Sequence, residues 1–317
     1  MLRTTQRDSA SPTERAGLGI ALVLLAGASF SLLDGTVKHL SAFLPLLLVV
    51  WMRYVVQALV MGVWLALRGG RARFRVAHPS FQVLRGALLL STSVLAFLGL
   101  RSMPVAEFTA IVMLAPVVVT LLSPLLLHER VSPLRWALVL LAFGGGLLVV
   151  RPGTGVFGAA AVYPMLVALA GALFQILTRR MASLEAPLTT HFCTGLVGAI
   201  LLSVALPFSS VPLLPVMVNA PAWQWGLMLL AGLLGTFGHL AFINAVGVAP
   251  MAVLMPFTYM QIACAALLGA IAFSHLPDHT ALAGMAVIAV SGALSVWLNV
   301  RSGPRTPVVA MDTTIGD

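Results

Sequence analysis

Charged residues are scarce in this sequence. Only 9% of its 317 residues are Asp, Glu, Lys or Arg, whereas 60% are hydrophobic. Soluble domains average about 25% charged residues, so water cannot be the solvent for most of this surface. The composition excludes an ordinary soluble domain and predicts an integral membrane protein.

Motifs for disulfide, metal and nucleotide chemistry are also missing. Cys193 and Cys264 both lie in apolar runs, where a thiol is usually a small core residue. No Gly-Lys-Ser/Thr phosphate-binding loop occurs. Segment 128–132 begins like a zinc-protease motif, but Ser132 stands where the second histidine would be. We therefore expect no disulfide, metal, cofactor or catalytic residue, and no ATP-driven pumping by this chain alone.

The apolar residues form ten long runs. About 17–25 apolar residues are needed to cross a bilayer as a helix, and these runs are continuous rather than alternating as in a barrel. The first run is too long for a signal peptide and has no convincing cleavage site. The expected spans are about 18–37, 45–67, 83–100, 105–127, 134–150, 159–178, 188–206, 224–246, 251–273 and 281–300.

Basic residues outnumber acidic ones, 18 to 9, but no basic groove interleaved with aromatic residues points to nucleic acid. Membrane orientation explains the excess, because Lys and Arg concentrate in cytoplasmic loops. With a cytoplasmic N-terminus, only Lys38, Arg101 and Arg151 fall outside, and Arg53 falls within a span. The other fourteen fall inside, so both termini should be cytoplasmic. These fourteen are Arg3, Arg7, Arg15, Arg68, Arg71, Arg73, Arg75, Arg85, Arg130, Arg135, Arg179, Arg180, Arg301 and Arg305.

The chain repeats itself at a nearly constant offset. Gly27-Ala28-Ser29-Phe30 is echoed by Gly171-Ala172-Leu173-Phe174, and Pro104 recurs as Pro250. Five spans per unit is an odd number, so the second unit should enter the membrane from the opposite side. The predicted fold is an all-α integral membrane protein of ten helices, arranged as two inverted five-helix repeats. The predicted units are 17–151 and 158–301, flanked by disordered cytoplasmic tails at 1–16 and 302–317.

Three ionisable side chains stand out within the spans: Asp34, Arg53 and Glu107. A charge inside a membrane is unfavourable and therefore points to function, and the helical rise places all three toward the outer side. We expect Arg53 to bind an anionic group or to pair with Asp34 or Glu107. Either carboxylate is a candidate for proton coupling. The alternative is a static ion pair, or Asp34 tied to Lys38 one turn further along.

Polar residues near the expected depth of a substrate complete the candidate site. Gln57 lies one turn beyond Arg53, and His239 and Gln261 lie nearest that depth in the second half. The alternative for each is an ordinary hydrogen bond between helices. The glycines at 232, 235 and 238 are expected to serve close helix packing. Further polar positions in the second half are Gln175, His191, Asn244 and Tyr259.

The order and spacing of several short motifs resemble the EamA-domain group of the drug/metabolite transporter superfamily, over about residues 17–301. The resemblance implies a secondary transporter of the bacterial inner membrane, with a central cavity in which Arg53 is a plausible lining residue. Known members export amino acids and other metabolites, and a related branch takes up S-adenosylmethionine. His275 departs from the family, which usually has Glu at the end of the ninth span. The motifs are Asp34 to Lys38, Arg53, Ala115-Pro116, Leu127-His128-Glu129-Arg130, Arg151-Pro152-Gly153, Phe257-Thr258-Tyr259-Met260-Gln261 and Leu276-Pro277-Asp278.

These observations predict an alternating-access carrier for small polar or zwitterionic metabolites such as amino acids, with export favoured. The alternative is uptake of an adenosylated cation such as S-adenosylmethionine, for which Asp34 and Glu107 would be the partners. An intramembrane enzyme or a scaffold is more remote, because only Asp34, Arg53 and Glu107 could converge as catalytic groups. The expected partners are a small-molecule substrate, membrane lipid and protons, without nucleic acid, and the chain is expected to be a monomer or homodimer.

Overall fold

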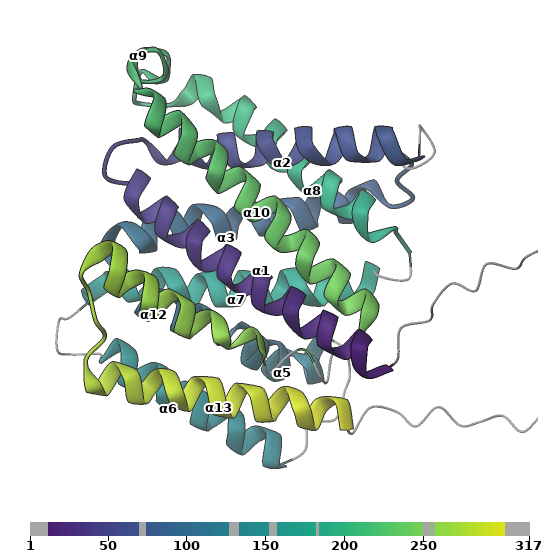
Figure 1. The fold of residues 1–317 in the computed structure, drawn as a ribbon, viewed down its shortest axis with the longest axis vertical. Coiled ribbons are helices and arrows are strands. Elements are labelled where there is room, and N and C mark those ends of the chain that lie inside the picture. Colours follow the sequence, from purple (N-terminus) through teal and green to yellow (C-terminus); the bar gives the residue numbers. More distant parts are fainter. Residues whose placement is uncertain are drawn as a thin grey trace, which may run out of the picture.

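Long apolar runs fold as helices because a helix satisfies its own backbone hydrogen bonds where no water is available. The computed structural model describes residues 12–69, 74–126, 133–151, 157–181, 184–249, 254 and 257–301. Within those ranges the protein is helical and has no β-strand (Figure 1). The two ends of the described chain, Pro12 and Arg301, lie at the same end of the bundle.

The elements follow one another with short connections. They are α1 (Pro12–Leu40), α2 (Leu46–Gly69), α3 (Pro79–Ser102), α4 (Val105–Val112), α5 (Ala115–Leu126), α6 (Pro133–Val150), η2 (Gly158–Ala161), α7 (Val162–Met181), α8 (Pro187–Ala205), η3 (Leu206–Phe208), α9 (Leu213–Asn219), α10 (Ala222–Val248), α12 (Met260–Phe273) and α13 (His279–Arg301).

Seven helical stretches of the described chain are long and apolar enough to cross a membrane. Three shorter apolar stretches, Trp136–Val150, Met260–Phe273 and His279–Leu294, lie where the other three spans are expected. Many large hydrophobic side chains are exposed, including Leu67, Leu140 and Ile271. Since soluble monomers rarely expose large apolar patches, these findings confirm an all-α membrane protein. Ten spans and the inverted repeat stay predictions.

Two boundaries differ from those expected. The first helix begins at Pro12, so residues 12–16 are helical rather than part of a tail. Proline suits a helix start because the first N–H groups of a helix have no partner anyway. The expected fourth span divides into α4 and α5. Pro116 has no N–H to donate to the carbonyl of Val112, and a proline of this kind breaks a helix.

The helices pack in a definite set of neighbours. The helix α1 lies against α10 and α12, α2 against α8 and α10, and α3 against α7 and α8. The pair α6 and α13 packs closely at one edge of the bundle (Figure 1). A Cβ on Gly145 would lie 2.9 Å from the carbonyl oxygen of Gly284, so glycine is what allows this close approach.

Buried aromatic residues form much of the core between these helices. Tyr54, Phe97 and Phe108 are each less than 2% exposed. The glycines of α10 permit the packing expected of them, because a Cβ on Gly232 would lie 2.5 Å from Cβ of Val56. These contacts hold α2 against α10, and both helices carry residues of the candidate site.

Candidate functional site

Arg53 lies in a polar layer between α2, α3 and α10. Its Nη1 donates to Ser93 Oγ at 2.5 Å, and the Tyr54 hydroxyl lies 2.9 Å from the same oxygen. Ser93 in turn donates to the carbonyl of Leu89. Asp34 lies close enough to the guanidinium for the two side chains to interact electrostatically. Arg53 Nε is buried and has no hydrogen-bond partner among the described residues, so this cation keeps one unused donor.

Gly235 on α10 makes the room for this guanidinium. A Cβ at position 235 would lie 3.0 Å from Arg53 Nε and 3.5 Å from Nη2. The carbonyl oxygen of Gly235 lies 2.7 Å from His239 Nδ1. One turn of α10 therefore positions both the expected cation and the expected histidine.

Two histidines from different helices stack beside Arg53. The rings of His191 on α8 and His239 on α10 have centroids 5.5 Å apart, and Phe30 meets His239 edge-on at 4.8 Å. Gln57 Nε2 lies 3.1 Å from the carbonyl of His191 and 3.2 Å from its Nδ1. Because Gln57 Nε2 is a donor, Nδ1 accepts and Nε2 carries the proton. The His191 ring is buried and also lies within hydrogen-bonding reach of the Thr236 backbone on α10.

The predicted site residues thus divide into two groups. Arg53, Gln57 and His239 come together through His191 and Gly235. Gln261, on α12, is buried against α1, where its carbonyl accepts from Ser31 Oγ at 3.1 Å. The sequence indicates His191 only as one of several polar positions in the second half of the chain. His191 joins Gln57 to His239, and this role follows only from the packing of α8 beside α2 and α10.

Arg85 is a second buried arginine, although the distribution of charge in the sequence predicts that it lies with the cytoplasmic loops. It lies in α3 and is 6% exposed. Its Nε donates to Thr178 Oγ1 at 2.8 Å, and its Nη1 donates to the carbonyl of Thr190 and to Thr194 Oγ1. The Phe174 ring lies 4.4 Å from the guanidinium carbon. The expected span 83–100 already contained Arg85, and its nearness to the helix start hid its burial.

Glu107 and Lys38 belong to a separate cluster at the end of the bundle away from Pro12 and Arg301. Glu107 is 3% exposed, and its Oε1 lies 2.9 Å from His275 Nε2. Lys38 donates to the carbonyls of Leu100 and Met103 at 2.9 and 2.7 Å. In place of the expected contact with Asp34, Lys38 therefore caps the last turn of α3.

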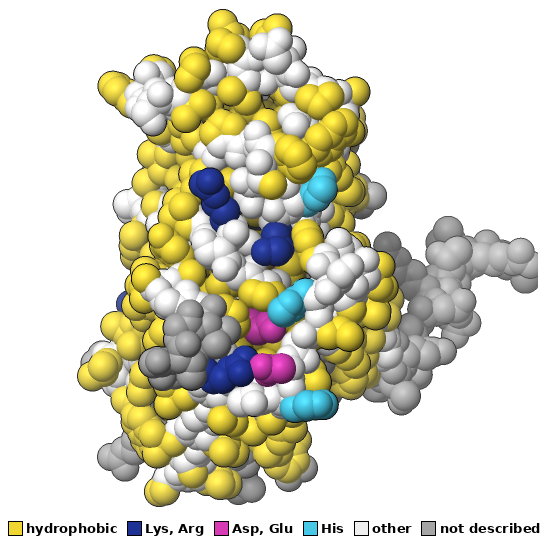
Figure 2. Space-filling view, turned by 90° about the vertical axis from the view of Figure 1, so that its left-hand side faces the viewer, with side chains coloured by type: hydrophobic (Ala, Val, Ile, Leu, Met, Phe, Trp, Pro, Cys, Tyr) yellow, Lys and Arg dark blue, Asp and Glu magenta, His cyan; other side chains and the backbone are white. Residues whose placement is uncertain are grey.

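An ion pair joins α6 to the start of α13 at the same end. Arg151 Nη2 lies 2.7 Å from Asp278 Oδ2, and Asp278 Oδ1 accepts from the backbone N–H of Ala281. The Ala281 N–H and then the Arg151 guanidinium hold the pKa of Asp278 below its ordinary value. Figure 2 looks onto this end and shows charged and histidine side chains gathered along its middle, surrounded by hydrophobic ones.

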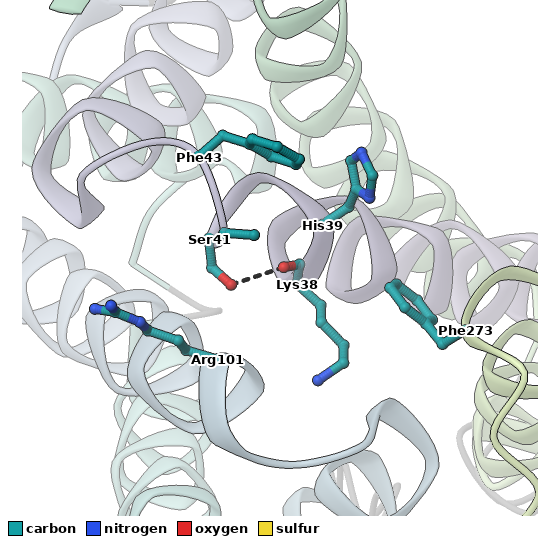
Figure 3. A pocket seen from close by; sticks show the side chains of 7 residues that line it. Lys38, His39, Ser41, Phe43, Arg101 and Phe273 are labelled. Atoms are coloured by element: carbon teal, nitrogen blue, oxygen red, sulfur yellow. Dashed lines mark hydrogen bonds between the residues drawn. The ribbon is translucent and has the colours of Figure 1, made fainter.

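A pocket of about 460 Å³ opens at this end. Figure 3 shows it between the end of α1, the end of α3 and the end of α12. The described residues that line it are Lys38, His39, Ser41, Ala42, Phe43, Arg101 and Phe273.

Apolar helices that enclose buried arginine, histidine and glutamine side chains are typical of multi-pass membrane transporters. Charged groups inside a membrane bundle typically mark a substrate or ion pathway. Residues 17–151 match the EamA-like transporter family. These residues carry the first group of motifs that resemble the EamA group of the drug/metabolite transporters.

Curated relatives cover nearly the whole chain. The riboflavin transporter of Rhizobium johnstonii is 28% identical over 306 residues, which are 95% of this chain and 98% of that protein. The pseudopaline exporter CntI of Pseudomonas aeruginosa is 27% identical, covering 86% and 94%. The S-adenosylmethionine uptake transporter of Rickettsia prowazekii is 23% identical, covering 85% and 89%.

A solved crystal structure shares the fold. It is 21% identical, and the match covers 92% of this chain and 100% of that one, with a TM-score of 0.60. The family match and the transporter names of the bacterial relatives indicate a multi-pass bacterial membrane transporter of a small molecule. Within the described residues, no group of three His, Cys, Asp or Glu side chains could hold a metal ion.

Proposed function

We propose that this protein is a secondary carrier that moves small polar or zwitterionic metabolites, such as amino acids, by alternating access, with export as its main direction. The observation that carries the proposal is the polar layer between α2, α3, α8 and α10. One buried donor in it, Arg53 Nε, has no partner among the described residues. An unmet buried donor is unfavourable, and a substrate carboxylate would satisfy it.

The proposal assigns a role to each candidate. Arg53 binds the carboxylate of the cargo, and Gln57, His239 and Gln261 supply hydrogen bonds to its other polar groups. Asp34 interacts electrostatically with Arg53, so an ionised Asp34 would compete with the cargo carboxylate for one guanidinium. Protonation of Asp34 would release Arg53 to the cargo, which couples the two. Glu107 is the second proton candidate, since its Oε2 has no described partner.

Alternating access needs two units that can move against each other, and the proposal places them at 17–151 and 158–301 as inverted repeats. If α7 is the counterpart of α1 and α10 that of α3, the α1–α10 contact should have α3–α7 as its counterpart. Both are extensive contacts in the bundle. In the same scheme α2–α10 corresponds to α3–α8, and these pairs also pack together. Both termini would be cytoplasmic, in the inner membrane.

The test is a thermal-shift screen of the purified chain against metabolites. A ligand that binds the folded state raises its apparent stability by mass action. We expect a zwitterionic metabolite to raise the Tm of the wild type and not that of Arg53→Ala. Arg75→Ala serves as the control, because Arg75 is an exposed arginine outside the spans. An equal shift in Arg53→Ala would remove Arg53 from the site.

A second candidate is uptake of an adenosylated cation. It is favoured by the S-adenosylmethionine relative and by Asp34 and Glu107, which would be the partners of a cationic cargo. Growth rescue of a cell that cannot make the compound would support uptake. Resistance to a toxic amino-acid analogue on expression of the chain would support export.

A further inference from the structure

The pocket at the end of the bundle has the size and the charge of an anion site. Its volume of about 460 Å³ lies within the range of small-molecule sites, about 300–1,000 Å³. Lys38 and Arg101 both line it, and none of the described lining residues is acidic. Glu107 lies close enough to Lys38 to interact with it electrostatically. That carboxylate is already bonded to His275, and Arg101 adds a second, exposed cation.

Lys38 is held in place before any ligand arrives. Its ammonium donates to Leu100 and Met103 carbonyls and lies 5.8 Å from the centre of the Phe273 ring. An ammonium has three donors, and one is therefore still available to a ligand. Figure 3 shows Lys38 between the helix that carries Arg101 and the side chain of Phe273. A fixed cation loses little conformational entropy on binding.

Aromatic side chains supply flat walls on another side of the pocket. Phe43 and His39 have ring centroids 5.4 Å apart, and Trp223 packs edge-on against Phe43 at 5.1 Å. Figure 3 shows His39 and Phe43 side by side at the end of α1. Flat aromatic walls beside two cations suit a planar ring that carries a carboxylate.

We infer that this pocket is a binding site for a planar organic anion. Only the purpose of this site rests on the proposed carrier function: the pocket would receive the anionic end of the cargo at this end of the bundle. Lys38 lies one helical turn from Asp34 on α1. The pocket lies at the helix ends (Figures 2 and 3) and so opens toward water, which favours a soluble ligand over a lipid headgroup.

The probe is benzoate, titrated against the full-length chain in phosphatidylcholine nanodiscs. The signal is the fluorescence of Trp223, whose ring lies 5.8 Å from that of His39 and 5.1 Å from that of Phe43. Trp223→Phe identifies that signal among the six tryptophans. We expect saturable binding that weakens about tenfold in Lys38→Gln and in Arg101→Gln, as expected when a charge-assisted hydrogen bond is lost. Arg75→Gln, an exposed arginine outside the pocket, should bind like the wild type.

Arg101→Gln decides the outcome even if Lys38→Gln disturbs the end of α3, because Arg101 is exposed and its replacement should not affect folding. Wild-type affinity in Arg101→Gln, or equal binding of uncharged benzamide, would overturn the inference. Loss of benzoate binding when phosphatidylglycerol is added would make a lipid headgroup the occupant and would also overturn it. Binding is read here without transport, so a failure of the carrier function would leave this titration unchanged.

Discussion

The imidazole of His275 and the carboxylate of Glu107 join the loop after α12 to the first turn of α4, with 2.9 Å between Nε2 and Oε1. The sequence marked each residue separately, Glu107 as a charge within a span and His275 as a departure from the family. Their contact explains both, because a buried carboxylate needs a hydrogen-bonded partner. Only Oε1 of Glu107 contacts His275, while Oε2 has no partner among the described residues.

His275→Ala should therefore destabilise the protein. It leaves the Glu107 carboxylate buried without its described partner, and we expect a loss of about 1–3 kcal/mol in the free energy of unfolding. Denaturant unfolding in detergent measures it. His279→Ala is the matched control, since His279 is exposed and lies four residues away. If both variants unfold alike, the contact contributes nothing to stability.

Gly235→Ala should weaken cargo binding with little effect on the fold. The added Cβ would lie 3.0 Å from Arg53 Nε, so the guanidinium must move. We expect the apparent Kd for the metabolite found in the thermal-shift screen to rise about tenfold. Gly226→Ala on the same helix is the control, because its Cβ would meet no described atom within 4 Å. An unchanged Kd in Gly235→Ala would separate Arg53 from the cargo.

Ser93→Ala removes the oxygen that accepts from Arg53 and contacts Tyr54. We expect a loss of about 1–2 kcal/mol in the free energy of unfolding, measured by chemical denaturation. Ser91→Ala, on the same helix, removes an exposed hydroxyl bonded only within its own helix and should stay within about 0.5 kcal/mol of the wild type. If Ser93→Ala and Ser91→Ala unfold alike, the contacts of Ser93 with Arg53 and Tyr54 contribute nothing to stability.

At acid pH, Asp278 should contribute less to the stability of the folded protein. Its pKa in the folded protein is lowered from 3.8, first by the Ala281 N–H and also by Arg151. The carboxylate therefore stabilises the fold fully above the unfolded pKa, about 3.8, and loses that effect as the pH falls through its lower folded value. Asp278→Asn should have a lower Tm than the wild type at pH 7, and the gap should narrow below pH of about 4. A gap that is constant with pH would exclude the charge as its cause.

Composition and hydropathy were enough to predict an all-helical membrane protein, because solvent preference is a property of each segment by itself. The division of the fourth span was predictable in principle, since Pro116 stands in its middle. The candidate site was only partly predictable. Arg53, Gln57 and His239 could be found as polar residues in apolar runs, whereas His191 and Arg85 depend on which helix faces which. Gln57 and His191 are 134 positions apart in the chain, and Arg85 and Thr178 are 93 positions apart. No local sequence pattern indicates contacts over such separations.

The central claim is tested most directly by transport itself. The purified chain in liposomes, loaded on one side with the labelled metabolite from the thermal-shift screen, should show saturable flux across the bilayer. Arg53→Ala should reduce this flux at least about tenfold at a fixed low substrate concentration, while Arg75→Ala should match the wild type. Flux that does not saturate, or equal flux in Arg53→Ala and the wild type, would contradict a carrier built around Arg53.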